Sequence, residues 1–148
     1  MSLDAYQNNR ESEILSASPL ELVEMLYKGA IGYINDARRH LRAGEIRERS
    51  NAISKASAIL IELAQSLDHE KGGNISTTLA ELYDYIQRRL IKANVEQIEP
   101  PLIETTKLLE TLLEGWQACI PAATAASSQS SYDQSSYDKD YVPLAFNL

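Results

Sequence analysis

Apolar residues recur every three or four positions through four long segments of this sequence, and a helix breaker separates each segment from the next. Such spacing places the apolar side chains on one face of an α-helix. We therefore expect helices over about residues 19–43, 45–67, 75–93 and 100–121. In the first of these, the apolar positions are Val23, Leu26, Tyr27, Ala30, Ile34, Ala37 and Leu41.

The ends of the first segment carry the clearest helix signals. Ser18 and Glu21 have the spacing of a capping box, in which each side chain bonds to the backbone of the other residue. Pro19 suits the first helical position because no N–H is needed there. Gly44 follows the last apolar position and favours a helix end. The sequence therefore predicts a helix over 19–43.

Residues 68–74, with the sequence DHEKGGN, separate the second and third segments. Two glycines remove the steric limits that keep a chain helical, so we expect a flexible loop, with Asp68 and Asn74 capping the helices beside it. Helices of roughly 20 residues joined by short loops pack as antiparallel neighbours. The sequence predicts an all-α fold, an antiparallel up-down four-helix bundle over residues 18–121.

The two ends of the sequence differ from the bundle. Residues 1–17 have weak apolar periodicity, and we expect a short helix or an arm that lies on the bundle. Residues 122–148 are rich in Ser and repeat the motif SSYD at 130–133 and 135–138. Such a composition buries too little apolar area to offset the entropy of ordering, so we expect a disordered tail. Its stretch YVPLAFNL is apolar and could dock on another surface.

Composition and charge argue against several classes of protein. The net charge of −7 disfavours general nucleic-acid binding, which needs clustered cations to displace counterions. No run of about 18 apolar residues suggests a membrane span, and residues 1–13 lack the features of a secretion signal. The single cysteine, Cys119, cannot form an internal disulfide, which indicates an intracellular protein. Near a helix end, it is typically a small buried hydrophobe.

The titratable side chains form no catalytic pattern. His40 follows Asp36 by four residues near a helix C-terminus, which favours a surface pair, and His69 lies in the expected loop. There is no Glu-x-x-His pair, and residues 71–74 lack the pattern of a phosphate loop. We therefore expect no enzyme activity, no metal site and no cofactor.

Basic residues gather where the first and third helices end. One explanation is that cations complement the helix C-termini, interleaved with acidic residues. The other is that an acidic segment docks at this end. The residues concerned are Arg38, Arg39, Arg42, Arg47, Arg49, Arg88, Arg89 and Lys92.

The apolar faces are wider than a bundle core requires. On the third helix, the core positions fall within an arc of about 100°, but Tyr85 and Ile91 lie outside it. On the second helix, Ile59 and Ile61 widen the apolar face. Adjacent helices with such shoulders form a groove that can bind an amphipathic helix. Alternatively, the N-terminal arm, the tail or a second copy covers these residues, or they are scattered exposed side chains.

Two stretches carry a resemblance to a known family. SASPLELVEMLYKGAI at 16–31 and ISKASAILIELAQSLDHEKGGNISTTLAELYDYIQRRLIKAN at 53–94 resemble the FliS flagellar secretion chaperones. Tyr6, within AYQNN, matches the N-terminal tyrosine of that family. The resemblance covers about residues 1–120, and the QIEPPLIE connection and the SSYD tail depart from it.

The resemblance implies a cytoplasmic chaperone that binds the disordered C-terminal segment of flagellin. In the family this segment wraps around the bundle, becomes helical in apolar grooves, and is kept from polymerising until it is delivered to the export gate of the flagellar type III apparatus. The N-terminal arm covers part of this surface when no client is bound, so Tyr6 would be a displaceable cap. Some relatives also contact an anti-sigma factor. Without a client we expect a monomer or a weak homodimer.

The matching stretches also supply the expected client-binding residues. The expected groove lining is Ile59, Leu63, Leu67, Ile75, Leu79, Tyr83 and Tyr85. Leu63, Leu67, Leu79 and Tyr83 fit the core stripe equally well, so both roles stay open for them.

Three polar residues complete the expected site. Arg88 would contact the client at the rim of the groove, and Asp68 and Asn74 would lie beside it, although helix capping explains these two as well. The alternative function is a self-associating helical bundle, structural or regulatory, whose apolar shoulders form a homodimer and which has no flagellin client.

Overall fold

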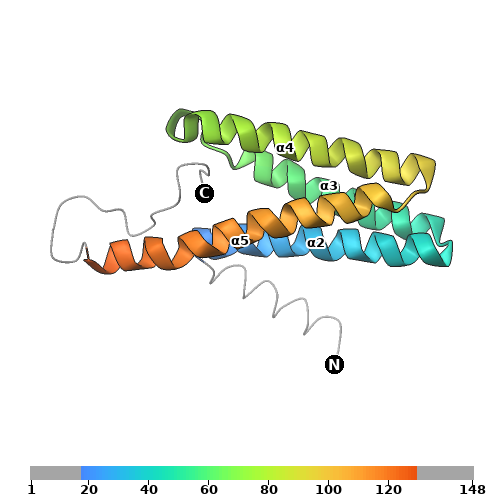
Figure 1. Cartoon of the computed structure of the whole chain (residues 1–148), viewed down its shortest axis with the longest axis horizontal. Coiled ribbons are helices and arrows are strands. Elements are labelled where there is room, and N and C mark those ends of the chain that lie inside the picture. Colours follow the sequence, from blue (N-terminus) through green and yellow to red (C-terminus); the bar gives the residue numbers. More distant parts are fainter. Residues whose placement is uncertain (1–17, 130–148) are drawn as a thin grey trace, which may run out of the picture.

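The computed structural model describes residues 18–129 and the side chains of residues 18–119 (Figure 1). The predicted N-terminal arm with Tyr6, and residues 130–148, lie outside the described residues. Between Ser18 and Gln129 the fold consists of four helices without a strand: α2 (Pro19–Ala43), α3 (Ile46–Gln65), α4 (His69–Glu96) and α5 (Pro100–Gln129).

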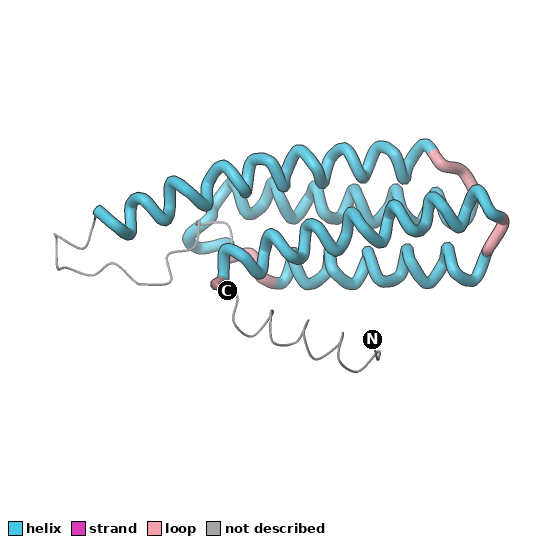
Figure 2. Tube along the Cα trace, turned by 90° about the horizontal axis from the view of Figure 1, so that it is seen from below, coloured by secondary structure: helices cyan, strands magenta, loops and turns pink. Residues whose placement is uncertain are grey.

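Successive helices run antiparallel and close into a ring (Figures 1 and 2). Helix α2 packs against α3 and α5, and α4 packs against the same two helices from the other side. This arrangement confirms the predicted all-α up-down bundle.

Helix α2 has the predicted bounds. Ser18 Oγ accepts a hydrogen bond from the Glu21 backbone N–H at 3.2 Å, and Ser18 N–H donates to Glu21 Oε2 at 3.3 Å, which completes the capping box. At the other end, Gly44 has a φ of +72° and its N–H donates to the carbonyls of His40 and Leu41. Local capping chemistry therefore fixes both ends of α2.

Helix α4 begins earlier than predicted. Asp68 Oδ1 accepts hydrogen bonds from the backbone N–H groups of Glu70 at 3.1 Å and Lys71 at 2.9 Å, so a helical turn forms inside the expected loop. The helix is interrupted only at Gly73, with φ +51° and ψ −123°, a conformation that glycine adopts at low cost. Asn74 lies inside α4, where its carbonyl accepts from Thr78 Oγ1 at 2.8 Å. The expectation of a loop over 68–74 was wrong, because the Asp68 cap favours a helix there.

Helix α5 extends past Pro121 to Gln129 and projects beyond the rest of the bundle (Figure 2). The sequence predicted a helix end near residue 121. Residues 122–126 include four alanines, which have the highest helix propensity, and the backbone there is helical.

The core takes residues from all four helices. Ile46 and Ile75, which the apolar periodicity placed on core faces, are 58% and 62% exposed. Both lie near the beginning of their helices, and periodicity indicates a face but not how far a neighbouring helix covers it. The large fully buried side chains include Val23, Ile34, Leu60, Leu63, Tyr83, Ile86, Leu90, Leu102 and Leu109.

Candidate functional site

The first candidate surface follows the seam between α2 and α3. On α2, Leu22, Leu26, Gly29 and Tyr33 recur at three- and four-residue spacing and therefore share one face. All four are half-buried. A methyl group at Gly29 would lie 3.1 Å from Ile59 Cδ1. The missing side chain at Gly29 therefore lets Ile59 of α3 lie close to α2.

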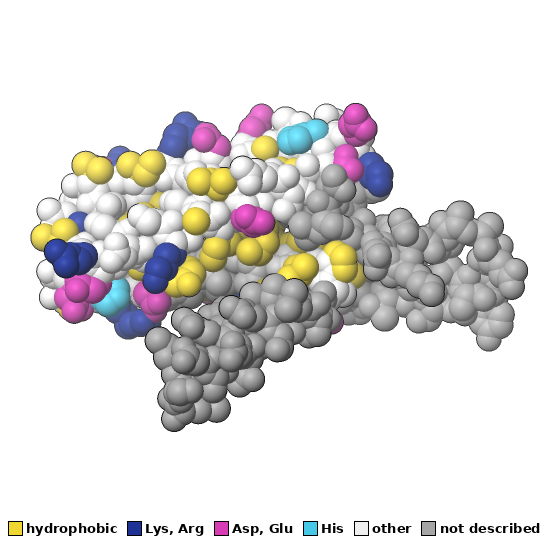
Figure 3. All heavy atoms as spheres, turned by 180° about the vertical axis from the view of Figure 1, so that it is seen from behind, with side chains coloured by type: hydrophobic (Ala, Val, Ile, Leu, Met, Phe, Trp, Pro, Cys, Tyr) yellow, Lys and Arg dark blue, Asp and Glu magenta, His cyan; other side chains and the backbone are white. Residues whose placement is uncertain are grey.

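This seam, which we call the α2–α3 surface, changes from apolar to charged along its length. Figure 3 shows hydrophobic side chains in a row across the middle of the face seen from behind. Lys55 Nζ lies 5.5 Å from the centre of the Tyr33 ring, a cation–π contact. Beyond it, the seam opens into a pocket of about 220 Å³ that is lined by Tyr33, Asp36, His40, Glu48, Asn51, Ala52 and Lys55.

The second candidate surface lies on α4. Ile75 is exposed and Leu79 is half-buried. The Tyr85 hydroxyl lies 3.0 Å from both carboxylate oxygens of Glu104, and Arg89 Nε donates to Glu104 Oε1 at 2.7 Å. The hydrogen bond to the Glu104 carboxylate raises the pKa of the Tyr85 hydroxyl. Tyr85 is therefore held at the surface by a polar contact between α4 and α5.

The predicted groove residues do not share one surface. Ile59 faces α2, whereas Ile75, Leu79 and Tyr85 lie on α4. For three further residues the sequence left open whether they belong to the core or to the groove, and the structure places all three in the core. Leu63, Leu67 and Tyr83 are 0%, 7% and 0% exposed.

The predicted polar residues have local partners. Arg88 is exposed and pairs with Asp84 on its own helix at 3.0 Å. Asp68 caps α4, as described above. Asn74 is exposed, and the side chain that caps α4 is that of Asp68. Arg88 and Asn74 are thus accessible from solvent, whereas Asp68 has a structural role.

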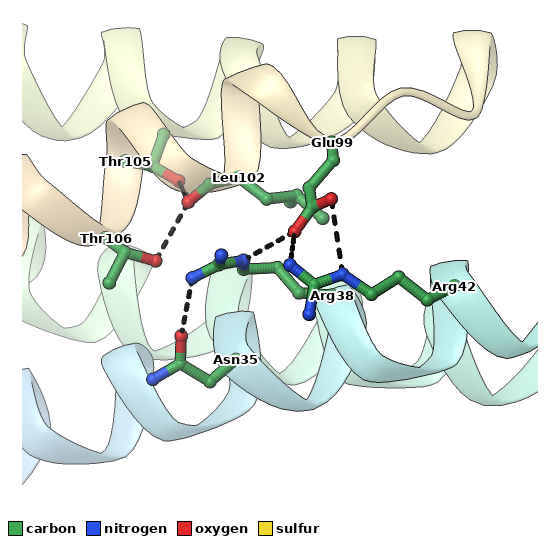
Figure 4. A network of polar contacts seen from close by, with 7 residues as sticks. All are labelled: Asn35, Arg38, Arg42, Glu99, Leu102, Thr105 and Thr106. Carbon is green, nitrogen blue, oxygen red and sulfur yellow. Dashed lines mark hydrogen bonds and ion pairs between the residues drawn. The ribbon is translucent and has the colours of Figure 1, made fainter.

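Several of the clustered cations bind acidic residues of the bundle itself. Arg38 Nε donates to Glu99 Oε1 at 3.1 Å, and Arg42 also donates to both oxygens of Glu99 (Figure 4). Hydrogen bonds from Arg42 and Arg38 lower the pKa of the Glu99 carboxyl. Arg49 is buried and donates to Asn94 Oδ1 at 2.9 Å. These contacts favour the first explanation of the basic cluster, that it complements groups of its own chain.

The structure also bears on metal binding and membrane insertion. Within residues 18–129, no three His, Cys, Asp or Glu side chains are grouped so that they could hold a metal ion. In the same range, no helix combines the length and the apolar character needed to cross a membrane. His40 Nδ1 lies 3.1 Å from Glu45 Oε1, so the predicted partner of His40, Asp36, was the wrong one.

Comparison with known proteins identifies the family. The family model described as flagellar protein FliS matches residues 2–123. The flagellar secretion chaperone FliS of Salmonella typhimurium is 41% identical over 120 residues, which cover 80% of this chain and 89% of that protein. The protein of the same name from Campylobacter jejuni is 33% identical over 117 residues, 79% of this chain and 89% of that protein. The chain therefore belongs to the FliS family of flagellar proteins.

Proposed function

We propose that this protein is a cytoplasmic export chaperone that binds the disordered C-terminal segment of flagellin. The observation that carries the proposal is the presence of accessible apolar side chains on two separate sides of one bundle. Ile59 lies on the α2–α3 surface, and Ile75 and Tyr85 lie on α4. Two such surfaces suit an extended client that wraps around the bundle better than a single compact partner.

The chemistry of the α2–α3 surface suits an amphipathic client helix. Its apolar part, with Leu26 and Ile59, offers contacts for the apolar face of a helix. Its charged part, with Lys55 and Glu48, offers partners for the polar residues at the edge of that face. A segment that folds on binding loses conformational entropy, which keeps a large interface releasable.

The α4 surface supplies the second contact. Ile75 is 62% exposed, and Tyr85 is 37% exposed. Arg88 follows Tyr85 by one turn of α4 and provides a cation at the rim. Binding at both surfaces would hide the apolar residues that flagellin otherwise uses in the filament, so the client stays unpolymerised until it is delivered to the flagellar export gate.

The proposal is tested by calorimetric titration of the full chain with a peptide of the last several tens of residues of the host flagellin. We expect binding near one to one with a negative heat-capacity change, which indicates burial of apolar surface. Ile59→Glu and Tyr85→Glu should each weaken binding by about tenfold or more, as for central interface residues. Ile91→Glu is the matched control, because Ile91 is 58% exposed but lies on neither surface.

Two results would contradict the proposal. If the wild-type chain does not bind the peptide, the flagellin client is wrong. If both variants bind like the wild type, the client is supported but the two surfaces are not. Light scattering without peptide tests the alternative of a self-associating bundle, which requires a stable dimer mass that the same two variants reduce.

A further inference from the structure

One face of α4 is apolar and incompletely covered. Ile75, Leu79, Leu82 and Arg89 recur at three-, four- and seven-residue spacing, so they share this face. Arg89 Nε donates to Glu104 of α5 at 2.7 Å, which shows that the face is turned toward α5. Leu79 and Leu82 are nevertheless half-buried, and Ile75 is exposed. The cover that α5 provides therefore decreases toward the beginning of α4.

The facing side of α5 has the same character. Leu108 and Leu112 follow Glu104 at four-residue intervals, and Cys119 lies two turns further on the same side. Leu108 and Leu112 are half-buried, and Cys119 is exposed, contrary to the expectation of a buried thiol.

The two helices separate at the end where these residues lie. Ile75 lies about four turns before Arg89, and Cys119 lies about four turns after Glu104, so antiparallel packing brings both to the same level. Figure 1 shows α4 and α5 moving apart toward this end of the bundle. We define the α4–α5 face as Ile75, Leu79, Leu82, Leu108 and Leu112.

We propose that residues 141–148 of the same chain, YVPLAFNL, bind this α4–α5 face. Val142, Leu144, Phe146 and Leu148 occupy every second position, so an extended segment presents all four on one edge. Pro143 favours extended backbone at the residue before it. The segment thus carries an apolar edge that matches the apolar face in chemistry.

The connection to the bundle is long enough for this contact. Helix α5 ends at Gln129, and residues 130–140 link it to the segment. Fully extended, they span roughly 35–40 Å, whereas the level of Cys119 lies only about 15 Å back along α5. A covalent connection of this length places the segment at an effective concentration in the millimolar range near the bundle. A separate partner would have to compete with it.

The family match ends at residue 123, before this segment. The binding of residues 141–148 is therefore a property of this chain beyond the matched region. It does not depend on the flagellin client, because both the face and the segment belong to one molecule.

The test uses the full chain without any client. Cys119 is the single cysteine of the sequence, so a nitroxide spin label can be attached there without substitutions. Because Cys119 lies beside the α4–α5 face, a bound segment comes close to the label. While the label is in its oxidised, paramagnetic form, we expect it to broaden the amide NMR signals of residues 144–148 beyond detection. The signals should return after the label is reduced.

Three variants make the result specific. The tail variant Leu144→Ser/Phe146→Ser leaves the bundle untouched and should restore the signals. Ile75→Glu, which alters the α4–α5 face instead of the segment, should also restore the signals. Ile91→Glu, which alters a similarly exposed residue on another side of the same helix, should leave the loss of signal unchanged. Bundle amide signals at native positions show that each variant is folded.

Three outcomes would overturn the proposal. Equal signal loss in the wild type and in the tail variant would mean that the tether alone brings the segment near Cys119. If Ile91→Glu restores the amide signals and Ile75→Glu does not, the segment binds to a different surface from the α4–α5 face. Two further samples separate contact within one molecule from contact between molecules. If isotope-enriched molecules without the spin label lose signal when mixed with spin-labelled molecules, and if molecules carrying both labels keep their signals after dilution, a second copy of the chain is the occupant.

Discussion

The hydroxyl oxygens of Tyr27 and Tyr83 lie 2.5 Å apart inside the bundle, and their ring centroids are 6.5 Å apart. Tyr27 belongs to α2 and Tyr83 to α4, two helices that are not neighbours in the ring. The hydrogen bond therefore crosses the core. It also allows two phenol groups to be buried without leaving a polar atom unsatisfied.

Tyr83→Phe should lower the free energy of unfolding by about 1–3 kcal/mol, because it leaves the Tyr27 hydroxyl buried without its partner. The double variant Tyr27→Phe/Tyr83→Phe should be destabilised by less than the sum of the two single variants, since no orphaned hydroxyl remains. Urea unfolding of the four proteins measures the coupling. Strict additivity would show that the two hydroxyls do not depend on each other.

The same pair predicts a loss of stability at high pH. Burial raises the pKa of Tyr27 to about 12, and burial also raises the pKa of Tyr83. The unfolded chain releases these protons near pH 10, below the folded pKa, so the free energy of unfolding should fall as pH rises from about 10 to 12. Urea midpoints across this range measure the slope. The double Phe variant should show a shallower slope, and an unchanged slope would contradict the assignment.

Glu99→Gln should lower the free energy of unfolding by about 0.5–1 kcal/mol at neutral pH and low salt, because Arg38 and Arg42 lose their shared carboxylate. The folded pKa of Glu99 is lowered, so its contribution is present above the unfolded value of about 4.3 and is lost as pH falls through the folded value. Glu96→Gln is the control, since Glu96 pairs with Lys92 of its own helix at 3.7 Å. Urea unfolding should show a larger difference between the two variants at pH 7 than at pH 3.

Gly32→Ala should raise the free energy of unfolding by about 0.8–1 kcal/mol, because a methyl group there meets no atom within 4 Å and alanine favours the helix. Gly29→Ala has the same helix preference, but its methyl group must displace Ile59 Cδ1 from 3.1 Å. We expect a smaller gain in stability and weaker binding of the flagellin peptide. Thermal unfolding and calorimetry test both variants. Equal behaviour of the two variants in both assays would show that the position of Ile59 does not depend on the missing side chain at Gly29.

The parts of the fold that could be predicted are those with local causes. The capping box at Ser18 and Glu21 and the left-handed Gly44 act within one helical turn, so the sequence shows them directly. The turn capped by Asp68 could not be predicted in this way, because the two glycines after it favour an end to helical structure. The structure shows that only Gly73 departs from helical geometry.

The candidate site was harder to predict because it depends on contacts between distant residues. Tyr83 was expected either in the core or in a groove, and its partner Tyr27 lies on another helix. The spacing of apolar residues in α4 does not indicate that bond. The sequence does place one tyrosine on the core face of α2 and one on the core face of α4, which could have suggested a pair. Ile59 and Tyr85 were both predicted to contact the client. Spacing along the chain does not show that Ile59 lies beside α2 whereas Tyr85 contacts α5.

Asn94 shows how the bundle is held at one alignment. Its side-chain oxygen accepts from Arg49 at 2.9 Å and from Ser50 at 3.1 Å, and its backbone oxygen accepts from Arg49 at 3.3 Å. If α4 slid along α3 by one turn, apolar residues would meet other apolar residues, but a buried guanidinium would lose its acceptors. The polar contact thus gives one alignment of α4 against α3 a lower free energy than alignments shifted by a turn. A segment could then bind to the outer faces of the bundle, or leave them, without a change in how the helices pack inside.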